Sequence, residues 1–227
     1  MNKTILFLLV LTATIFSFTT LQTKKKIVFF GDSITQQGAG PNGYIRKFDS
    51  LLNEKGLSSK YETAGAGISG NKVYDLYLRM DSDVLMKSPD AVIIFIGVND
   101  VWHKRTSGTG TDADKFEKFY NAIIKKLKAK NIAVYLCTPT SIGEKNDFTN
   151  PLEGELNSYS AIIRKIAGDN NCPIIDLRQA FTSYLKTNNP DNKDRGILTT
   201  DGVHLNMAGN IFVAQKMFEV LSQNFIK

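Results

Sequence analysis

Short apolar runs recur along the chain, separated by longer segments in which apolar and polar residues mix. Most of these runs are continuous rather than alternating, which is typical of strands covered on both faces. The strands that we predict cover residues 27–31, 60–64, 91–96, 132–138 and 173–177.

Between these runs, apolar residues recur at helical spacing and form three clear stripes. They are Phe116, Phe119, Tyr120, Ile123, Ile124 and Leu127; Leu156, Tyr159, Ile163, Ile166 and Ala167; and Ile211, Ala214, Met217, Phe218 and Leu221. The first is opened by Thr111, with Asp114 three residues on, in a pattern like a capping box. Strands alternating with helices predict parallel strands joined by right-handed crossovers. We therefore expect a three-layer α/β/α sandwich around a five-stranded parallel sheet, with ligands at the carboxyl ends of the strands.

The composition fits one globular domain of 227 residues, because 42% hydrophobic and 22% charged residues allow an ample core. A formal net charge of +6 raises the question of an acidic partner. The lysines are scattered, however, and Lys125, Lys126, Lys128 and Lys130 share a helix whose other face is apolar. We interpret that cluster as a solvated face and expect no nucleic-acid binding.

The cysteine and histidine content argues against a disulfide framework and against a metal site. Cys137 lies toward the end of one predicted strand and Cys172 just before the start of the next, so we expect two free, buried thiols. Two histidines and two cysteines show no spacing typical of zinc ligands, and no Gly-rich phosphate loop follows a strand. Neither a metal nor another cofactor is therefore expected.

The first 23 residues have the layout of a secretory signal peptide, with Lys3 before an apolar stretch that gives way to Thr, Ser and Gln. No Ala-x-Ala site is present, and the uncharged stretch from Thr4 to Thr23 is about as long as a minimal membrane span. We predict a signal peptide at 1–23, with an uncleaved anchor as the alternative, and a mature domain at 24–227. The mature protein is then periplasmic or secreted, and its domain does not insert into a membrane.

Four segments carry candidate chemistry. Gly-Asp-Ser-Ile-Thr at 31–35 follows the first strand, Ile-Ser-Gly lies at 68–70, Gly-Val-Asn-Asp at 97–100 follows the third strand, and Asp-Gly-Val-His-Leu-Asn at 201–206 precedes the last helix. Taken singly, each is explained equally well as a turn or a helix cap. Together and in this order, from about Lys26 to the final helix, they resemble the four signature blocks of the SGNH (GDSL-type) hydrolases, which are serine esterases and lipases.

The resemblance implies a catalytic role for each block. Ser33 is the expected nucleophile and His204 the base, with Asp201 orienting the imidazole. The backbone N–H groups of Ser33 and Gly70 and the side-chain amide of Asn99 are the expected oxyanion hole. The family's strand order, 2-1-3-4-5, makes the loops after the first three strands neighbours at one edge of the sheet.

Three further residues are candidate substrate contacts: Asp32, Trp102 and His103. His103 is the only other histidine, and we interpret it as a loop residue or a substrate contact rather than the base. Trp102 is either a core residue or an aromatic face for a sugar or an acyl group.

Two long polar loops, Pro139 to Pro151 and Lys186 to Thr200, are expected to flank the site and to set its specificity. Their few large apolar residues favour a small acyl group on a polar carrier. The sequence therefore predicts a serine esterase acting on short acyl esters, with a carbohydrate O-acetylesterase as the first interpretation. The alternatives are a lysophospholipase or acyl thioesterase and, as a weaker one, a catalytically silent carbohydrate-binding module.

Overall fold

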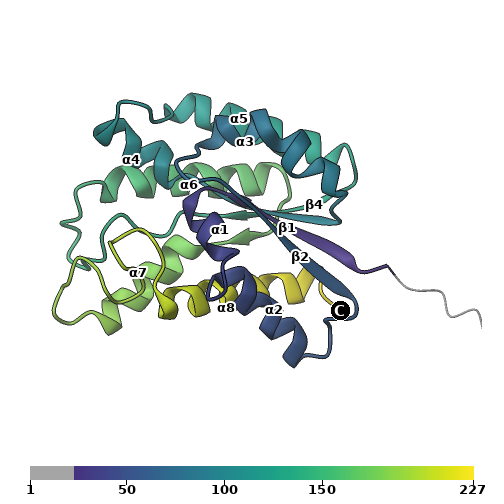
Figure 1. Ribbon diagram of the computed structural model, residues 1–227. Helices are drawn as coiled ribbons and strands as arrows, with labels where there is room; N and C mark the ends of the chain where they lie inside the picture. Colours follow the sequence, from purple (N-terminus) through teal and green to yellow (C-terminus); the bar gives the residue numbers. More distant parts are fainter. Residues whose placement is uncertain (1–22) are drawn as a thin grey trace, which may run out of the picture.

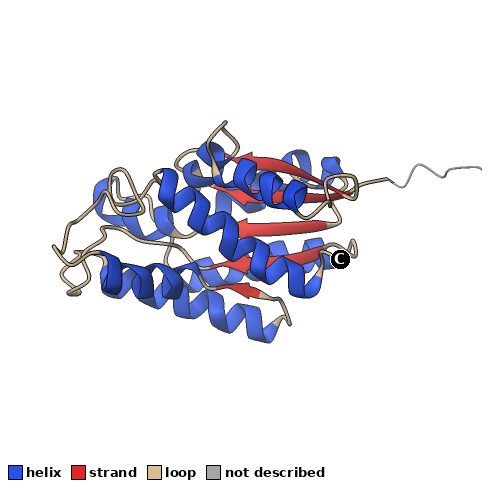
Figure 2. Ribbon diagram, turned by 90° about the horizontal axis from the view of Figure 1, so that it is seen from below, coloured by secondary structure: helices blue, strands red, loops and turns tan. Residues whose placement is uncertain are grey.

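The computed structural model describes residues 23–227 and contains a five-stranded parallel sheet in the order β2-β1-β3-β4-β5. The strands are β1 (Lys25–Gly31), β2 (Tyr61–Gly67), β3 (Ala91–Phe95), β4 (Ala133–Cys137) and β5 (Ile174–Ile175). All four neighbouring pairs are parallel. The predicted sheet and its strand order are therefore confirmed, and in Figure 2 all the arrowheads lie at the same end of the sheet.

Eight α-helices and one 3₁₀ helix accompany the sheet in the part of the chain that the structure describes. They are α1 (Ser33–Gly38), α2 (Tyr44–Glu54), α3 (Val73–Asp83), η1 (Leu85–Lys87), α4 (Val98–Thr106), α5 (Ala113–Lys128), α6 (Glu153–Asp169), α7 (Leu177–Asn188) and α8 (Met207–Asn224). Figure 1 shows α3, α5 and α6 over one face of the sheet and α2, α7 and α8 over the other, which is the predicted three-layer arrangement.

Alternate side chains of the central strands pack into two separate hydrophobic cores, one on each face of the sheet. Val28 and Phe30 of β1 pack with α3, α5 and α6, whereas Ile27 and Phe29 pack with α2, α7 and α8. Because both faces are covered, every one of these side chains is fully buried. The continuous apolar runs in the sequence follow directly from this two-sided burial.

Element ends differ from the sequence prediction where polar or small residues obscure the pattern. β2 runs on to Gly67, past the predicted end at residue 64, through a Thr-Ala-Gly-Ala-Gly segment that carries little apolar signal. β5 has only two residues, because Asp176 caps α7 through a hydrogen bond from the backbone N–H of Gln179. The loop predicted from Lys186 begins only after α7 ends at Asn188.

The predicted cap of the helix at 113–128 is wrong. Asp112 occupies the N-cap of α5 and its side chain makes no capping hydrogen bond. Thr111 lies outside the helix, where its backbone N–H donates to the carbonyl oxygen of Asp100. A long-range contact with α4 therefore replaces the local capping box.

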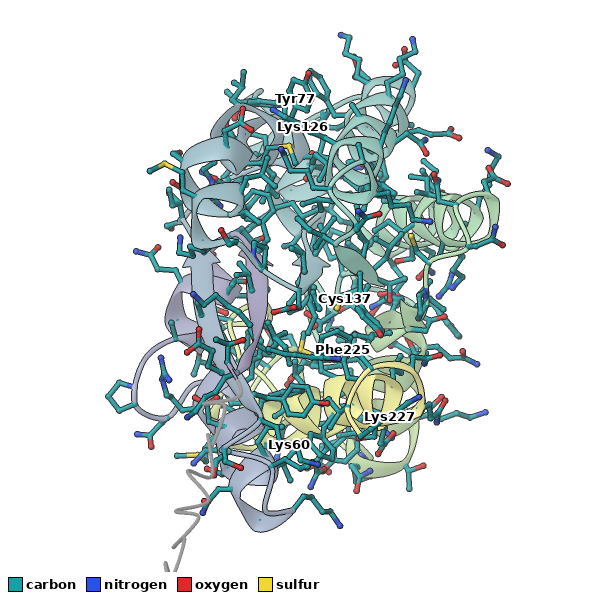
Figure 3. All side chains as sticks on the ribbon, turned by 90° about the vertical axis from the view of Figure 1, so that its right-hand side faces the viewer. Lys60, Tyr77, Lys126, Cys137, Phe225 and Lys227 are labelled. Carbon is teal, nitrogen blue, oxygen red and sulfur yellow. The ribbon has the colours of Figure 1, made fainter. Side chains whose placement is uncertain are left out.

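Both cysteines are free and buried, as predicted. Figure 3 shows Cys137 in the interior, between the two helical layers. The same view shows Phe225 and Lys227 close to Lys60, where the carbonyl of Phe225 accepts a hydrogen bond from the hydroxyl of Tyr61. The end of the chain is thus fixed beside the amino ends of the strands.

Within residues 23–227, no helix is both long and apolar enough to cross a bilayer. The signal-peptide segment at 1–23 lies outside the described residues except for its last position.

Candidate active site

Ser33 stands at the junction of β1 and α1. It is the first residue of the helix, after Asp32 at the N-cap, whose Oδ1 accepts a hydrogen bond of 3.0 Å from the N–H of Ile34. The strand and the cap fix the backbone of this turn, and the serine is 7% exposed. Its hydroxyl therefore has a fixed position at the carboxyl edge of the sheet.

The structure brings the three residues of the expected triad together. Ser33 Oγ lies 2.9 Å from His204 Nε2, although 171 positions separate them in the sequence. On the other side of the ring, His204 Nδ1 lies 2.7 Å from Asp201 Oδ2. Because a carboxylate only accepts hydrogen bonds, Nδ1 carries the proton and Nε2 is free to accept the serine proton.

Asp201 is held as an ionised carboxylate. Partial burial opposes its ionisation, but the His204 ring and the backbone N–H groups of His204 and Val203 all bond to it, and the net effect lowers the pKa of Asp201. Its Oδ1 accepts both backbone N–H groups, at 2.7 Å from His204 and 2.9 Å from Val203. The carboxylate is therefore part of a tight turn that also orients the imidazole.

The strand register brings the segments that carry the expected oxyanion donors to the same edge of the sheet as the serine. Gly31 of β1 aligns with Gly67 of β2 on one side and with Phe95 of β3 on the other, so three loops leave the sheet at one level. The loop after β2 is tied to α1, because the N–H of Ser69 donates to Gln36 Oε1 at 2.8 Å. Gly70 follows directly.

Gly70 is glycine for a conformational reason. Its φ is +78°, which side chains other than glycine rarely adopt, while a Cβ there would meet only His103 Cε1, at 3.9 Å. The backbone conformation of this turn therefore favours glycine at position 70.

Asn99 lies in the first turn of α4 and is 4% exposed. One N–H of its side-chain amide donates to the carbonyl oxygen of Asn71 at 3.1 Å, which fixes the orientation of the amide. The amide nitrogen carries a second N–H that can donate to a negatively charged oxygen.

The three candidate substrate contacts differ in their surroundings. Asp32 is 2% exposed and is occupied as a helix cap; burial, helped by the charge of Asp100, raises its pKa to about 7. That placement does not favour a substrate contact. Trp102 is half-buried and packs against both cores, whereas the ring of His103 faces Gly70. His103 therefore lies next to Gly70 of the expected oxyanion loop, and His204 is the histidine whose ring nitrogen lies within hydrogen-bond distance of Ser33 Oγ.

Glu144, which the sequence did not single out, connects the two long loops. Its carboxylate is fully buried and accepts hydrogen bonds of 2.7 Å from each of the backbone N–H groups of Ile197, Leu198 and Thr199. These residues lead directly into the turn at Asp201. A glutamate within a polar loop gives no sequence signal for such a role.

The sequence did not single out Arg79 either, because a charged residue on a helix is usually solvated. From α3, its Nη2 donates to the carbonyl oxygens of Gly31 at 2.7 Å and Ala66 at 3.0 Å, and its Nε donates to Asn71 Oδ1 at 2.6 Å. One guanidinium thus joins the ends of β1 and β2 to the oxyanion loop.

Across the described part of the chain, no cluster of three or more His, Cys, Asp or Glu side chains has the arrangement of a metal site.

Known proteins similar to this chain include several ester hydrolases. A family model described as the GDSL-like lipase/acylhydrolase family matches residues 29–210. The chain is 29% identical over 219 residues to the acetylxylan esterase of Geobacillus stearothermophilus, covering 89% of this chain and 96% of that protein. It is 26% identical over 219 residues to the isoamyl acetate-hydrolyzing esterase 1 homolog of Rattus norvegicus, covering 87% and 82%.

Among solved structures, the acetyl xylan esterase AlAXEase matches with a TM-score of 0.84 and 62% identity, over 86% of this chain and 98% of that one. Catalytic mutants of the Geobacillus enzyme, in which alanine replaces a serine or a histidine, match at 26% identity with a TM-score of 0.77, over 91% of this chain and 99% of theirs. With the family model matching most of its length, this chain belongs to the GDSL-like lipase/acylhydrolase family and is a carboxylic ester hydrolase.

Proposed function

We propose that the protein removes acetyl groups from a carbohydrate, with Ser33 as nucleophile, His204 as general base and Asp201 as the group that orients the imidazole. The observation that carries this proposal is the continuous chain of hydrogen bonds from Ser33 through His204 to Asp201, at 2.9 and 2.7 Å. The esterase relatives support the acyl-transfer chemistry, and the acetylxylan esterases among them support the substrate class.

The reaction follows from the positions of the protons. Ser33 Oγ attacks the ester carbonyl as its proton passes to His204 Nε2, and the resulting imidazolium is stabilised by Asp201. The negative carbonyl oxygen is bound by the N–H groups of Ser33 and Gly70 and by the amide of Asn99. As the bond between the carbonyl carbon and the sugar oxygen breaks, His204 gives its proton to that oxygen, which leaves as a hydroxyl group. Water then hydrolyses the acetyl-enzyme by the same route, with His204 again as the base, and frees Ser33.

A groove lined by residues that flank the Asp201–His204 turn, Thr200 and Leu205 among them, supports a carbohydrate as the alcohol part of the ester. It has a volume of about 430 Å³ and lies between the α1 region and the residues on either side of the Asp201 turn. Its lining includes Gln37 and Asn42, together with Asn206 and Asn210, whose side-chain N–H groups already donate to backbone carbonyl oxygens. The amides of Gln37 and Asn42 offer both donors and acceptors, which suits the hydroxyl groups of a sugar.

The test is a panel of p-nitrophenyl esters from acetyl to decanoyl, assayed beside acetylated xylo-oligosaccharides. We expect kcat/KM to peak at acetyl and to fall beyond about four carbons, because the two long loops hold few large apolar residues and so return little of the roughly 0.8 kcal/mol per methylene that burial can provide. A preference for eight or more carbons would instead support a lysophospholipase or thioesterase. Ser33→Ala is the control, and wild-type turnover in that variant would disprove the serine mechanism itself.

We further propose that residues 1–23 direct export and are removed. Expression of the full chain in a bacterium, followed by N-terminal sequencing of the exported protein, tests this. An intact N-terminus in the membrane fraction would support the anchor instead.

A further inference from the structure

Lys72 is a nearly buried cation next to the expected oxyanion loop. The residue is 7% exposed, and its Nζ donates to the carbonyl oxygen of Gly70 at 3.0 Å. The nearest carboxylate oxygen that forms an ion pair with it, Asp75 Oδ2, is 3.9 Å away. Burying an ammonium group costs free energy, and this one has a main-chain carbonyl as its closest partner.

The residues on the C-terminal side of Gly70 are held in place without help from this ammonium. Asn71 is bound on both sides, with its carbonyl oxygen accepting from Asn99 Nδ2 at 3.1 Å and its Oδ1 accepting from Arg79 Nε at 2.6 Å. The start of α3 is also bound independently, because Val73 N–H donates to Asp100 Oδ1 at 3.1 Å. An apolar side chain at position 72 would fill the same space without the cost of a buried charge.

The charge of Lys72 reaches the groups around the site. Burial lowers the pKa of His103, and the positive charge of Lys72 lowers it further. The same charge partly offsets the burial that raises the pKa of Asp100 to about 6. Three covalent bonds separate the Gly70 carbonyl oxygen from the Gly70 nitrogen, so the two atoms are at most about 4 Å apart. The ammonium is therefore within about 7 Å of the proposed oxyanion donor.

We propose that Lys72 is a positioning residue of the oxyanion hole: it fixes the Gly70 peptide through the carbonyl and places a buried positive charge behind the donor. The negative charge that develops on the substrate oxygen is then stabilised in the transition state more than in the bound ester. This inference rests on the proposed function, in which Gly70 N–H is an oxyanion donor.

Three substitutions separate the hydrogen bond from the charge. Lys72→Met removes both, Lys72→Gln keeps an N–H that can reach the Gly70 carbonyl, and Lys72→Arg keeps the charge. We expect kcat/KM for p-nitrophenyl acetate to fall about 10-fold to 100-fold in the Met and Gln variants, with KM changed less than about 2-fold. The Arg variant should recover most of the loss.

Affinity for a short alkylboronic acid supplies a measurement that a purely structural role would not move in this way. Boron accepts the electron pair of Ser33 Oγ as the serine proton passes to His204, which gives a tetrahedral anion like the reaction intermediate. We expect boronate affinity in the Met and Gln variants to fall by the same factor as kcat/KM. The control is Lys104→Met, which removes a partly buried ammonium bound to Glu155 and Tyr159; it should lower stability but leave kcat/KM within about 3-fold.

Histidine NMR gives a second, independent readout, because the chain has only two histidines, His103 and His204. Without the positive charge at position 72, the pKa of His103 should rise toward its ordinary value in Lys72→Gln. Unchanged kcat/KM and boronate affinity in a folded Lys72→Gln variant would overturn the proposal. Should Lys72→Met fail to fold, the Gln and Arg variants still decide it. Turnover by Ser33→Ala would instead overturn the proposed function, so the two failures are distinguishable.

Discussion

Replacing Glu144 by alanine tests how the two long loops hold the base in place. The carboxylate is fully buried, and its two oxygens accept three backbone N–H groups of the 197–199 segment, each at 2.7 Å. The main chain of Glu144 adds further contacts, since its N–H donates to the carbonyl of Asp194 and its carbonyl accepts from Asn189. Alanine keeps these main-chain contacts and removes only the carboxylate.

The expected loss of stability follows from the three donors left without an acceptor. An unpaired buried N–H costs about 1–3 kcal/mol, and water that enters the vacated space offsets part of it, so we expect Glu144→Ala to lose about 3–6 kcal/mol. For a chain of this size, each kcal/mol lowers Tm by roughly 2–4 °C, which gives a decrease on the order of 10–20 °C. Glu144→Gln keeps one acceptor oxygen but turns an NH₂ group toward a donor, so its loss should be smaller, about 1–3 kcal/mol.

Urea unfolding and kcat measured on the same samples check this reasoning. We expect kcat to fall about 10-fold or more in Glu144→Ala at a temperature where the variant is still folded, because the loosened segment carries Asp201 and His204. Glu219→Ala is the matched control, since Glu219 is exposed on α8 and pairs with Lys216; it should stay within about 0.5 kcal/mol of the wild type. A Glu144→Ala variant within about 1 kcal/mol of the wild type would refute the assigned role.

Four further outcomes are expected of the site. Ser33→Ala and His204→Ala should each abolish short-ester hydrolysis, and the double variant should be hardly worse than either, because members of one proton-transfer unit are not additive; additive losses would contradict the relay. Asn99→Ala should lower kcat about 100-fold to 1,000-fold with little change in KM, and a KM effect alone would remove it from the oxyanion hole. His103→Ala should change the preference among esters while keeping most of the turnover, and loss of all activity would reopen the choice of base. Because folding lowers the pKa of Asp201, its ionised carboxylate stabilises the folded state above about pH 4, and this contribution is lost as the pH falls through the lowered pKa. The difference in unfolding free energy between wild type and Asp201→Asn, measured by urea unfolding, should therefore be constant above about pH 4 and shrink below it.

The fold could be predicted from the sequence because strands that are buried on both faces appear as continuous apolar runs. The run at 27–30 is buried residue by residue, and β1 has a neighbouring strand on each side, β2 and β3, as the expected strand order requires. The prediction failed where that signal fades, as in the small residues at the end of β2 and in the two-residue β5. The predicted cap at Thr111 failed for a different reason. The backbone N–H of Thr111 bonds to Asp100, eleven positions away, and a contact between separate elements cannot be read from a local sequence pattern.

The residues that support the site could not be predicted in the same way. Lys72, Arg79 and Glu144 are ordinary charged residues in sequence, and each gains its role from main-chain groups brought close by the fold. Lone charges in loops or on helices are usually solvated, so only the burial and the partners of these three distinguish them. The signature blocks, in contrast, combine unusual neighbours in a fixed order, which a sequence alone can display.

The site divides into two halves with different mechanical support. The proposed nucleophile and oxyanion donors lie in the segments that follow three adjacent strands, and the register of β1 with β2 and β3 sets the level of those segments. The proposed base and its carboxylate lie on the loop between α7 and α8, which is held through the carboxylate of Glu144 and through Gly143 N–H, a donor to the carbonyl of Gly202. A substitution that loosens the loop between α7 and α8 should therefore weaken proton transfer but leave the oxyanion donors in place. Boronate binding also moves the serine proton to His204, so Glu144→Ala should lower both boronate affinity and kcat, but kcat more, because turnover also needs His204 to pass that proton on and to take another from water. Lys72→Gln should instead lower both by the same factor.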